Sequence, residues 1–165
     1  MVTPSQPAIR QLHSPIGRIE LIGDGETIIS LTIERNGALA HDDTERTSDR
    51  LLERAAQQLE QYFAGTRKAF DLPVDLGGTP FQRAVWAQLA LVPFGAVTSY
   101  GHIGRLTGRA SAGRAVGAAI GANPVPILVP CHRVLSASNR ITGYSAGNGI
   151  PTKQQLLCHE SISYR

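Results

Sequence analysis

The chain has 165 residues and a formal net charge of +3 at pH 7, with 42% hydrophobic and 18% charged residues. This composition predicts a packed core and excludes a wholly disordered chain. No apolar stretch reaches the roughly 18 residues of a membrane-spanning helix. The N-terminal stretch MVTPSQPAIRQLH lacks the apolar region of a signal peptide. We therefore expect a cytoplasmic protein with no membrane partner.

The two halves of the chain differ sharply in charge. Residues 1–76 contain 8 Lys and Arg and 12 Asp and Glu, a net charge of −4. Residues 77–165 contain 8 Lys and Arg and a single acid, Glu160, a net charge of +7. The split predicts two domains, the second of which faces a polyanion such as nucleic acid. A basic surface that serves only solubility would give the same counts, so charge alone leaves both explanations open.

Residues 1–76 have the pattern of strands followed by a helix. Ile19 and Leu21 alternate with polar neighbours, apolar residues alternate again over 29–33, and Asp24-Gly25 between the two runs predicts an antiparallel hairpin. Polar residues 36–48 predict a loop. Apolar residues then recur every four positions over 51–63, which predicts an amphipathic helix that ends near Gly65. We expect this domain to be a scaffold of antiparallel sheet plus helix that carries no chemistry.

Residues 77–165 have the pattern of short helices. Thr79-Pro80 predicts the start of a helix that continues to Val92. Ser99 predicts the cap of a short helix that ends at Gly108, and Ser111 predicts the start of another that runs to about residue 122. Two short helices joined by a glycine-containing turn in basic surroundings indicate a helix-turn-helix. The fold class is therefore expected to be α+β, with a mostly helical second domain that contains short strands.

The last of these helices is unusually rich in small residues. Of the 12 residues from Ser111 to Ala122, 8 are Ala or Gly. Glycine inside a helix costs up to about 1 kcal/mol relative to alanine, so Gly113, Gly117 and Gly121 need an explanation. Side chains that read base edges are scarce, with Arg114 the main candidate. Two explanations stay open: a surface pressed into a nucleic-acid groove without reading its sequence, or tight packing against another helix.

A candidate nucleophile follows this helix. Asn123-Pro124 predicts the helix end, and the apolar run over 124–131 predicts an extended segment that delivers Cys131 to a turn. A thiol is nucleophilic only as thiolate and needs a base or a nearby positive charge. His132 is the adjacent candidate base. Glu160 is the single carboxylate of the second half that could orient it.

Metal and cofactor sites are weaker explanations. Cys131-His132 and Cys158-His159 are pairs of adjacent residues, whereas structural zinc ligands are spaced so that both face one ion. We expect no metal site, with Cys158 packed inside the final helix, over 153–160, and His159 on its surface. Dinucleotide and P-loop motifs do not occur in the sequence, so we expect no cofactor. Two cysteines in a reducing compartment also predict no disulfide.

The residues around Cys131 resemble those of a known family. Pro130-Cys131-His132-Arg133-Val134, preceded by Asn123-Pro124 and followed by Thr142-Gly143-Tyr144, closely resembles the active-site signature of the O6-alkylguanine-DNA alkyltransferases, also called methylated-DNA–protein-cysteine methyltransferases. Further similar segments run along almost the whole chain, at residues 14–17, 81–82, 85–86, 92–95, 98–100, 114–117 and 156–157.

The resemblance implies DNA repair by direct, irreversible transfer of an alkyl group to Cys131. The substrate would be O6-alkylguanine in duplex DNA, with O4-alkylthymine as a further candidate. Cys131 would lose its proton through His132, by way of water, with Glu160 behind the imidazole. Asn123 would hold the hinge before the catalytic segment, and Tyr100 would donate a hydrogen bond to a guanine ring nitrogen. Because a thioether has no easy route back to a thiol, each molecule would act once.

The resemblance also implies how DNA and the damaged base are held. Residues Ser111, Ala112, Gly113, Arg114 and Ala115 would enter the minor groove of double-stranded DNA, and Arg114 would fill the space left by the flipped base. The carbonyls of Cys131 and Val134 would bind the exocyclic amine, and the Ser145 N–H would bind O6 in a pocket that includes Tyr144. The expected active form is a monomer, with cooperative binding to DNA left open.

Two departures and two alternatives accompany this interpretation. Lys153 lies nine residues after Tyr144, as if Asn148-Gly149 were inserted into the family's active-site loop, which would either bulge or change the pocket width. Asn139 stands where a glycine is usual, and both residue types tolerate a positive φ. One alternative is a related protein that binds alkylated DNA without transfer, although such relatives lack the cysteine. The other is a cysteine hydrolase, which would leave the Ala/Gly helix unexplained.

Overall fold

The predicted hairpin lies in a three-stranded antiparallel sheet with the order β1-β2-β3. The strands are β1 (Ala8–Leu12), β2 (Ile19–Gly23) and β3 (Ile28–Ile33). The turn between β2 and β3 is closed by Asp24, whose side chain accepts hydrogen bonds from the Glu26 and Thr27 N–H groups. The sequence did not predict β1, because its buried residues, Ile9 and Leu12, are three positions apart and do not alternate.

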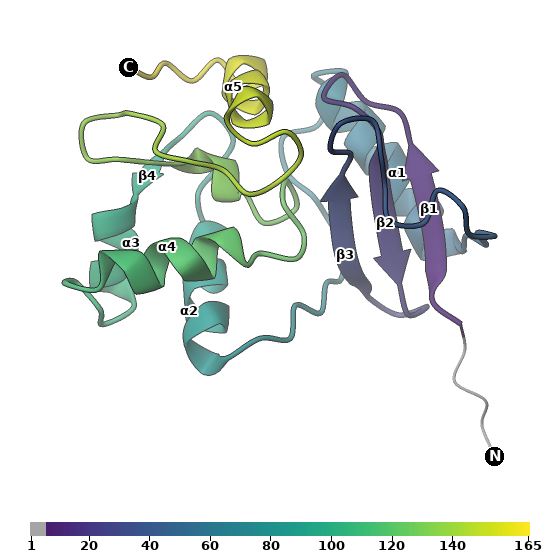
Figure 1. Cartoon of the computed structure of the whole chain (residues 1–165), viewed down its shortest axis with the longest axis horizontal. Coiled ribbons are helices and arrows are strands. Elements are labelled where there is room, and N and C mark those ends of the chain that lie inside the picture. The colour runs from purple at the N-terminus through teal and green to yellow at the C-terminus, as the bar shows by residue number, and fades with distance from the viewer. Residues whose placement is uncertain (1–5) are drawn as a thin grey trace. The chain divides into compact units, whose positions relative to one another are not determined.

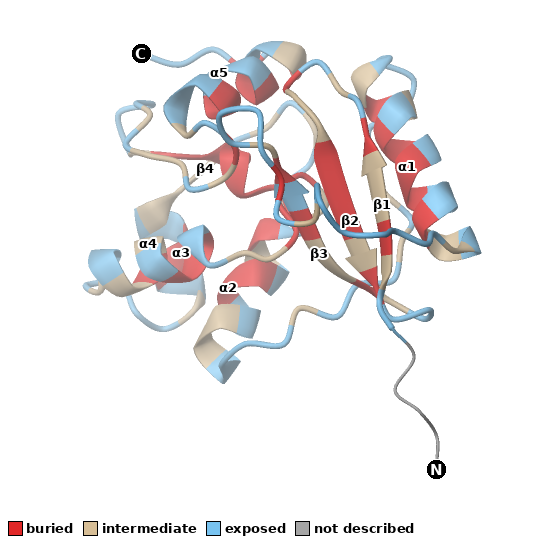
Figure 2. Ribbon diagram, turned by 45° about the vertical axis from the view of Figure 1, so that its right-hand side comes forward, coloured by how far each residue is buried: buried red, intermediate tan, exposed pale blue. Residues whose placement is uncertain are grey.

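Helix α1 (Arg50–Phe63) covers one face of this sheet (Figure 1). The Asp49 side chain caps its first turn by accepting a hydrogen bond from the Leu52 N–H. Leu52, Leu59 and Tyr62 are fully buried on the face toward the strands. The predicted helix is therefore confirmed. The buried residues of α1 and of the central strand β2 form the core of this unit (Figure 2).

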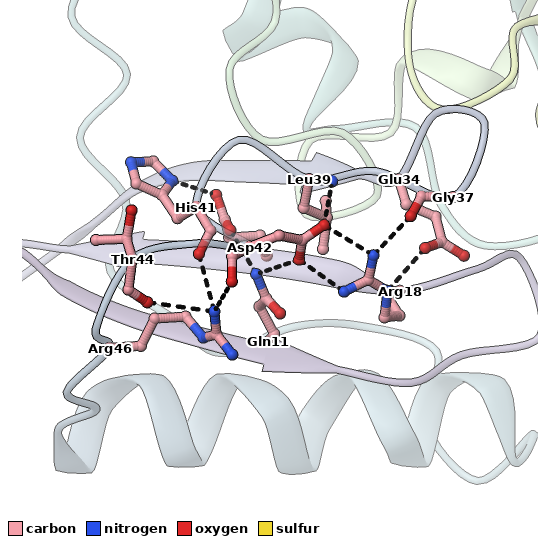
Figure 3. A network of polar contacts seen from close by, with 10 residues as sticks. Gln11, Arg18, Glu34, Gly37, Leu39, His41, Asp42, Thr44 and Arg46 are labelled. Carbon is pink, nitrogen blue, oxygen red and sulfur yellow. Dashed lines mark hydrogen bonds and ion pairs between the residues drawn. The ribbon is translucent and has the colours of Figure 1, made fainter.

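The loop over 34–48 is held to the sheet by a network of polar contacts (Figure 3). Arg18 on β2's N-terminal side donates to both carboxylate oxygens of Asp42, at 2.7 and 3.0 Å, and to Glu34 at 2.8 Å. The Asp42 carboxylate also accepts from the Leu39 N–H. The hydrogen bonds from Arg18 and Leu39 hold the pKa of Asp42 well below its usual range. A loop of polar sequence is thus ordered by one charged pair and its neighbours.

The structure describes residues 6–165, which divide into two compact units between Asp75 and Leu76. The second unit is built around α2 (Pro80–Leu89), α3 (Tyr100–Leu106) and α4 (Gly113–Gly121), which pack against one another. Among the described residues, no helix is both long and apolar enough to cross a membrane. The α+β class predicted from the sequence is confirmed.

The predicted helix starts in this unit are confirmed at two of three places. Thr79 and Gln82 form a reciprocal capping box at the start of α2, and Ser99 accepts from the His102 N–H at the start of α3. The α2 helix ends at Leu89 rather than at Val92, because the chain turns there before Pro93.

The prediction that Ser111 opens the next helix is wrong. Helix α4 begins at Gly113, and the residue at its N-cap position is Ala112, whose φ of −104° and ψ of 52° are not those of a capping residue. The turn before it is closed by hydrogen bonds from the Arg109 N–H to Gly104 and from the Ala112 N–H to Arg109. A Cβ at Gly104 would lie 3.0 Å from the Arg109 carbonyl, so glycine allows this tight turn between α3 and α4.

The prediction of an extended segment over 124–131 is also wrong. Ile127 has a φ of 76°, and the Val129 N–H bonds back to the Val125 carbonyl, so this segment is a compact turn. It leads into a 3₁₀ turn, η1 (Cys131–Arg133), and then β5 (Val134–Leu135), which pairs in parallel with β4 (Thr98–Ser99). Apolar residues at successive positions suit a buried turn as well as a buried strand.

The final helix, α5 (Ile150–His159), begins three residues earlier than predicted. Its last residue is His159, and Glu160 is the C-cap residue that follows. Asn139, in the turn after β5, has a φ of 61°. A positive φ is tolerated by asparagine and by the glycine that is usual at this position, as expected from the sequence.

We predict that Asp42→Asn loosens the loop over 34–48. The loss of the carboxylate weakens both contacts to Arg18, so trypsin should cleave after Arg46 several-fold faster than in the unchanged protein. Because the pKa of Asp42 is lowered in the folded protein, the same contact stabilises the loop at neutral pH and is lost as the pH falls. Asp43→Asn removes the same charge one residue away and serves as the control. Equal cleavage rates in the two variants would contradict this role of Asp42.

Candidate active site

A cavity of about 460 Å³ opens in the second unit beside Cys131. It lies between the Ala/Gly helix α4, Cys131 on η1 and the loop over 142–149. We call this loop the active-site loop. The lining residues are Tyr100, Gly113, Gly117, Ile120, Gly121, Cys131, Thr142, Gly143, Tyr144, Ser145 and Lys153. Its volume is typical of sites that hold a small molecule or a single base.

The candidate nucleophile is buried at the wall of this cavity. Cys131 is 5% exposed, and its Sγ lies 3.8 Å from the hydroxyl of Tyr144. Burial raises the pKa of the Cys131 thiol, whereas hydrogen bonds with Asn123 and Tyr144 and the charge of Lys153 act in the opposite direction. Because burial dominates, the resting group is a thiol, and reaction requires a group that takes up its proton.

His132 and Glu160 are brought together, as the sequence predicted. The His132 Nε2 is hydrogen-bonded to Oε2 of Glu160, and both side chains are fully buried. The other ring nitrogen, Nδ1, is buried and has no hydrogen-bond partner among the described residues. Burial lowers the pKa of His132, against the effect of the neighbouring carboxylate. A neutral imidazole with a free lone pair on Nδ1 is suited to accept a proton.

Glu160 also binds Arg133 and the backbone before β4. Arg133 donates to Oε1 through Nε at 2.8 Å and to Oε2 through Nη2 at 3.1 Å, and the Gly95 N–H donates to Oε1 at 3.0 Å. Burial would raise the pKa of Glu160, but the hydrogen bonds from His132 and Arg133 outweigh it and lower the pKa below its ordinary value. The carboxylate is therefore ionised at neutral pH and is both an orienting group and a structural link.

Asn123 positions the segment that carries the nucleophile. Its side-chain amide donates to the Val129 carbonyl at 2.8 Å and accepts from the Val125 N–H at 3.1 Å. These two bonds close the turn that replaces the predicted extended segment. Asn123 thus connects the end of α4 to the residues immediately before Cys131.

Lys153, which in the sequence served only as a marker for the end of the active-site loop, is itself a residue of the site. Its ammonium group is fully buried, and it donates to the carbonyls of Val134 at 2.6 Å and Gly143 at 3.3 Å. Burial lowers the pKa of Lys153 to about 8, opposed by the charge of Cys131 when it is ionised. The sequence signal was its place two turns before Glu160 on the final helix, but a lone lysine on a helix is usually at the surface.

The glycines of α4 face the cavity rather than another helix. Gly113, Gly117 and Gly121 are spaced four residues apart and all line the cavity. A Cβ at Gly113 or Gly117 would meet no atom within 4 Å, and at Gly121 the nearest atom would be Ser145 Oγ at 3.7 Å. Tight helix packing therefore does not explain these glycines, and the packing of α4 is carried by Val116 and Ala119, which are buried and do not line the cavity.

The active-site loop is tied to several elements. Thr142 Oγ1 donates to the Tyr100 hydroxyl at 3.2 Å, and Ser145 Oγ donates to the Gly121 carbonyl at 2.9 Å. The apparent insertion, Asn148-Gly149, forms the entry to α5: Gly149 is its N-cap residue with a φ of 76°, and the Asn148 N–H donates to Thr152. Neither residue lines the cavity.

The remaining predicted residues lie in different places. Val134 is buried and does not belong to the lining residues. Ser111 and Arg114 are exposed at the N-terminal end of α4, next to the half-buried Ala112 and Ala115. The expectation that Cys158 packs inside the last helix is wrong, because this thiol is exposed. No group of three or more candidate metal ligands occurs within residues 6–165.

Family models match both units of the chain. Residues 10–76 match the 6-O-methylguanine DNA methyltransferase ribonuclease-like domain, and residues 80–162 match the DNA binding domain of the same family.

Curated relatives carry a consistent name. The methylated-DNA–protein-cysteine methyltransferase of Mycobacterium tuberculosis strain H37Rv is 43% identical over 149 residues, which cover 90% of this chain and 88% of the relative. A constitutive methylated-DNA–protein-cysteine methyltransferase of Bacillus subtilis is 38% identical over 157 residues, covering 93% and 94% of the two chains.

Solved structures agree with these relatives. The crystal structure of the Mycobacterium tuberculosis O6-methylguanine methyltransferase matches with a TM-score of 0.82 and 41% identity, and covers 96% of this chain and 95% of that one. A structure of the same enzyme in complex with DNA matches with a TM-score of 0.80 and 42% identity over 93% and 92% of the chains. This chain therefore belongs to the 6-O-methylguanine DNA methyltransferase family.

Proposed function

We propose that the protein repairs DNA by transferring the alkyl group of O6-alkylguanine to Cys131, with O4-alkylthymine as a further candidate substrate. The observation that carries this proposal is the buried thiol of Cys131 at the wall of a base-sized cavity, with the His132–Glu160 pair beside it. In the reaction the bond between O6 and the alkyl carbon breaks and a bond from that carbon to Sγ forms. The thiol gives up one proton and the departing guanine gains one, so the step needs no cofactor.

The proton of Cys131 leaves through His132, by way of a bridging water. Nδ1 of His132 is the acceptor, since Nε2 is bonded to Glu160. Glu160 then stabilises the imidazolium that forms, as an ionised carboxylate does in other nucleophile–histidine–acid sites. The charge of Lys153 favours the thiolate from the cavity side.

The pocket residues hold the flipped guanine. Tyr100 accepts a hydrogen bond from Thr142, which leaves its own proton free to be donated to a ring nitrogen of the base. The Ser145 N–H binds O6, and the carbonyls of Cys131 and Val134 accept from the exocyclic amine. The Val134 carbonyl already accepts from Lys153, so it uses its second lone pair.

Residues 77–165 form the DNA-binding and catalytic domain, and residues 1–76 serve as a scaffold. The glycine row of α4 supports a close approach of DNA, because no side chain projects from it into the cavity. Ser111, Ala112, Gly113, Arg114 and Ala115 enter the minor groove, where readout is largely degenerate, and Arg114 takes the place of the flipped base. The proposed active form is a monomer.

We predict that Cys131→Ser abolishes alkyl transfer and leaves affinity for methylated duplex DNA within about twofold, because a hydroxyl is a far weaker nucleophile of similar size. Single-turnover transfer and DNA binding measure the two effects. Cys158→Ser is the matched control and should react at the normal rate, since that thiol is exposed and outside the cavity. Peptide mapping that found the methyl group on Cys158 would refute the assignment.

Arg114→Ala should slow repair of duplex DNA about tenfold or more and leave the reaction with free O6-benzylguanine within about twofold. A free base needs no flipping, so only the duplex substrate requires a side chain that fills the stack. Arg140→Ala removes the same charge from an exposed loop and should affect neither substrate. Equal losses on the two substrates would mean that Arg114 supports the fold instead.

Glu160→Gln should raise the apparent pKa at which iodoacetamide labels Cys131, because His132 becomes a weaker proton acceptor without the carboxylate. The variant should also lose about 3 kcal/mol of stability, since the buried Arg133 loses its ionic partner. Both the pH profile of labelling and the melting temperature are measured on the same sample. A lowered melting temperature with an unchanged pH profile would show that Glu160 is only a structural link to Arg133.

A further inference from the structure

The active-site loop binds a carbonyl at the C-terminal end of α4, that of Gly121. The last carbonyls of a helix lack partners within it. Here the Ala122 N–H bonds to the Ala118 and Ala119 carbonyls, and the Asn123 N–H bonds to the Ile120 carbonyl. The Gly121 carbonyl accepts from the hydroxyl of Ser145 at 2.9 Å. The loop therefore completes the hydrogen bonding of the helix end.

The active-site loop lies against α4 at Gly121. A Cβ at this position would lie within van der Waals contact of Ser145, at 3.7 Å from its Oγ and 4.0 Å from its Cβ. The Ser145 side chain thus lies against the edge of α4, and both residues line the cavity. The helix end itself is fixed from the core side, where Trp86 Nε1 donates to the Ala119 carbonyl at 2.8 Å.

The same helix end also fixes the nucleophile. Asn123, two residues beyond Gly121, donates to the Val129 carbonyl and so holds the turn that precedes Cys131. Two cavity-lining parts of the chain, Cys131 and Ser145, are therefore attached to the C-terminal end of α4: Ser145 to Gly121, and the turn before Cys131 to Asn123, which follows the C-cap residue. These two side-chain hydrogen bonds act together with Lys153, which donates to the Val134 and Gly143 carbonyls, to set the positions of Cys131 and the active-site loop.

We propose that Ser145 is a positioning residue whose hydroxyl, through its bond to the Gly121 carbonyl, holds the active-site loop against α4 and places the departing base opposite Cys131. The inference rests on the proposed alkyl transfer. It goes beyond that proposal because the side chain of Ser145 touches no reacting atom and acts through the loop backbone. Since α4 is also the proposed DNA-facing helix, the contact links the seating of DNA to the shape of the pocket.

The test compares Ser145→Ala and Ser145→Thr with the unchanged protein in single-turnover transfer from duplex DNA that contains O6-methylguanine. Ser145→Ala should lower the maximal rate about three- to tenfold, the range for loss of one neutral hydrogen bond, and leave the half-saturating DNA concentration unchanged. Ser145→Thr keeps the hydroxyl and should restore the rate to within about twofold. Iodoacetamide labelling of Cys131 should be the same in all three proteins, because this reagent reacts with the thiolate without a guanine held in the cavity.

Ser138→Ala is the control, since that hydroxyl contacts Ser136 in an exposed turn and should have no effect. A normal maximal rate in Ser145→Ala, or a Ser145→Thr protein as slow as Ser145→Ala, would overturn the inference. Slower iodoacetamide labelling in Ser145→Ala would also overturn it, because the defect would then be general disorder of the site. Absence of transfer by the unchanged protein would instead refute the proposed function itself, and with it this inference.

Discussion

The site depends on one buried carboxylate. Glu160 lies at the end of α5 and accepts hydrogen bonds from His132, Arg133 and the Gly95 N–H. It thereby joins the last helix, the 3₁₀ turn that carries Cys131 and the connection between α2 and β4. A buried charge without partners is strongly destabilising, whereas one with several donors is tolerated and fixes the geometry around it. Residues 77–165 contain no other acid, so no second carboxylate of this unit could replace it.

Burial of Cys131 and His132 orders the site and also keeps the thiol of Cys131 in its unreactive, neutral form before substrate binds. Desolvation raises the pKa of Cys131 and lowers the pKa of His132, so both groups are neutral before substrate arrives. Ionised Glu160 favours the imidazolium form of His132, and the charge of buried Lys153 favours the thiolate form of Cys131. This balance suits a protein that is consumed by its own reaction, since a permanently ionised thiol would react with other electrophiles.

The sequence predicted the parts of the structure that local rules determine. The hairpin at Asp24, the capped starts of α2 and α3 and the stop at Pro124 follow from turn and capping chemistry within a few residues. The place of His132 next to Cys131 and the single acid of residues 77–165 indicated His132 and Glu160, which the fold brings together across 28 positions. The strand β1 and the compact turn around Ile127 were not predictable, because their burial is decided by distant partners. Lys153 was missed for the same reason: only the folded chain shows that its ammonium group is buried between two carbonyls.

The most direct test of single-use transfer to Cys131 is a titration followed by intact-mass measurement. The protein is mixed with increasing amounts of duplex DNA that contains O6-methylguanine, up to several equivalents. We predict that each molecule gains one CH₂ unit, that repair stops at one equivalent, and that the modified peptide contains Cys131. Continued repair beyond one equivalent, or repair without a change in protein mass, would contradict irreversible transfer to this thiol.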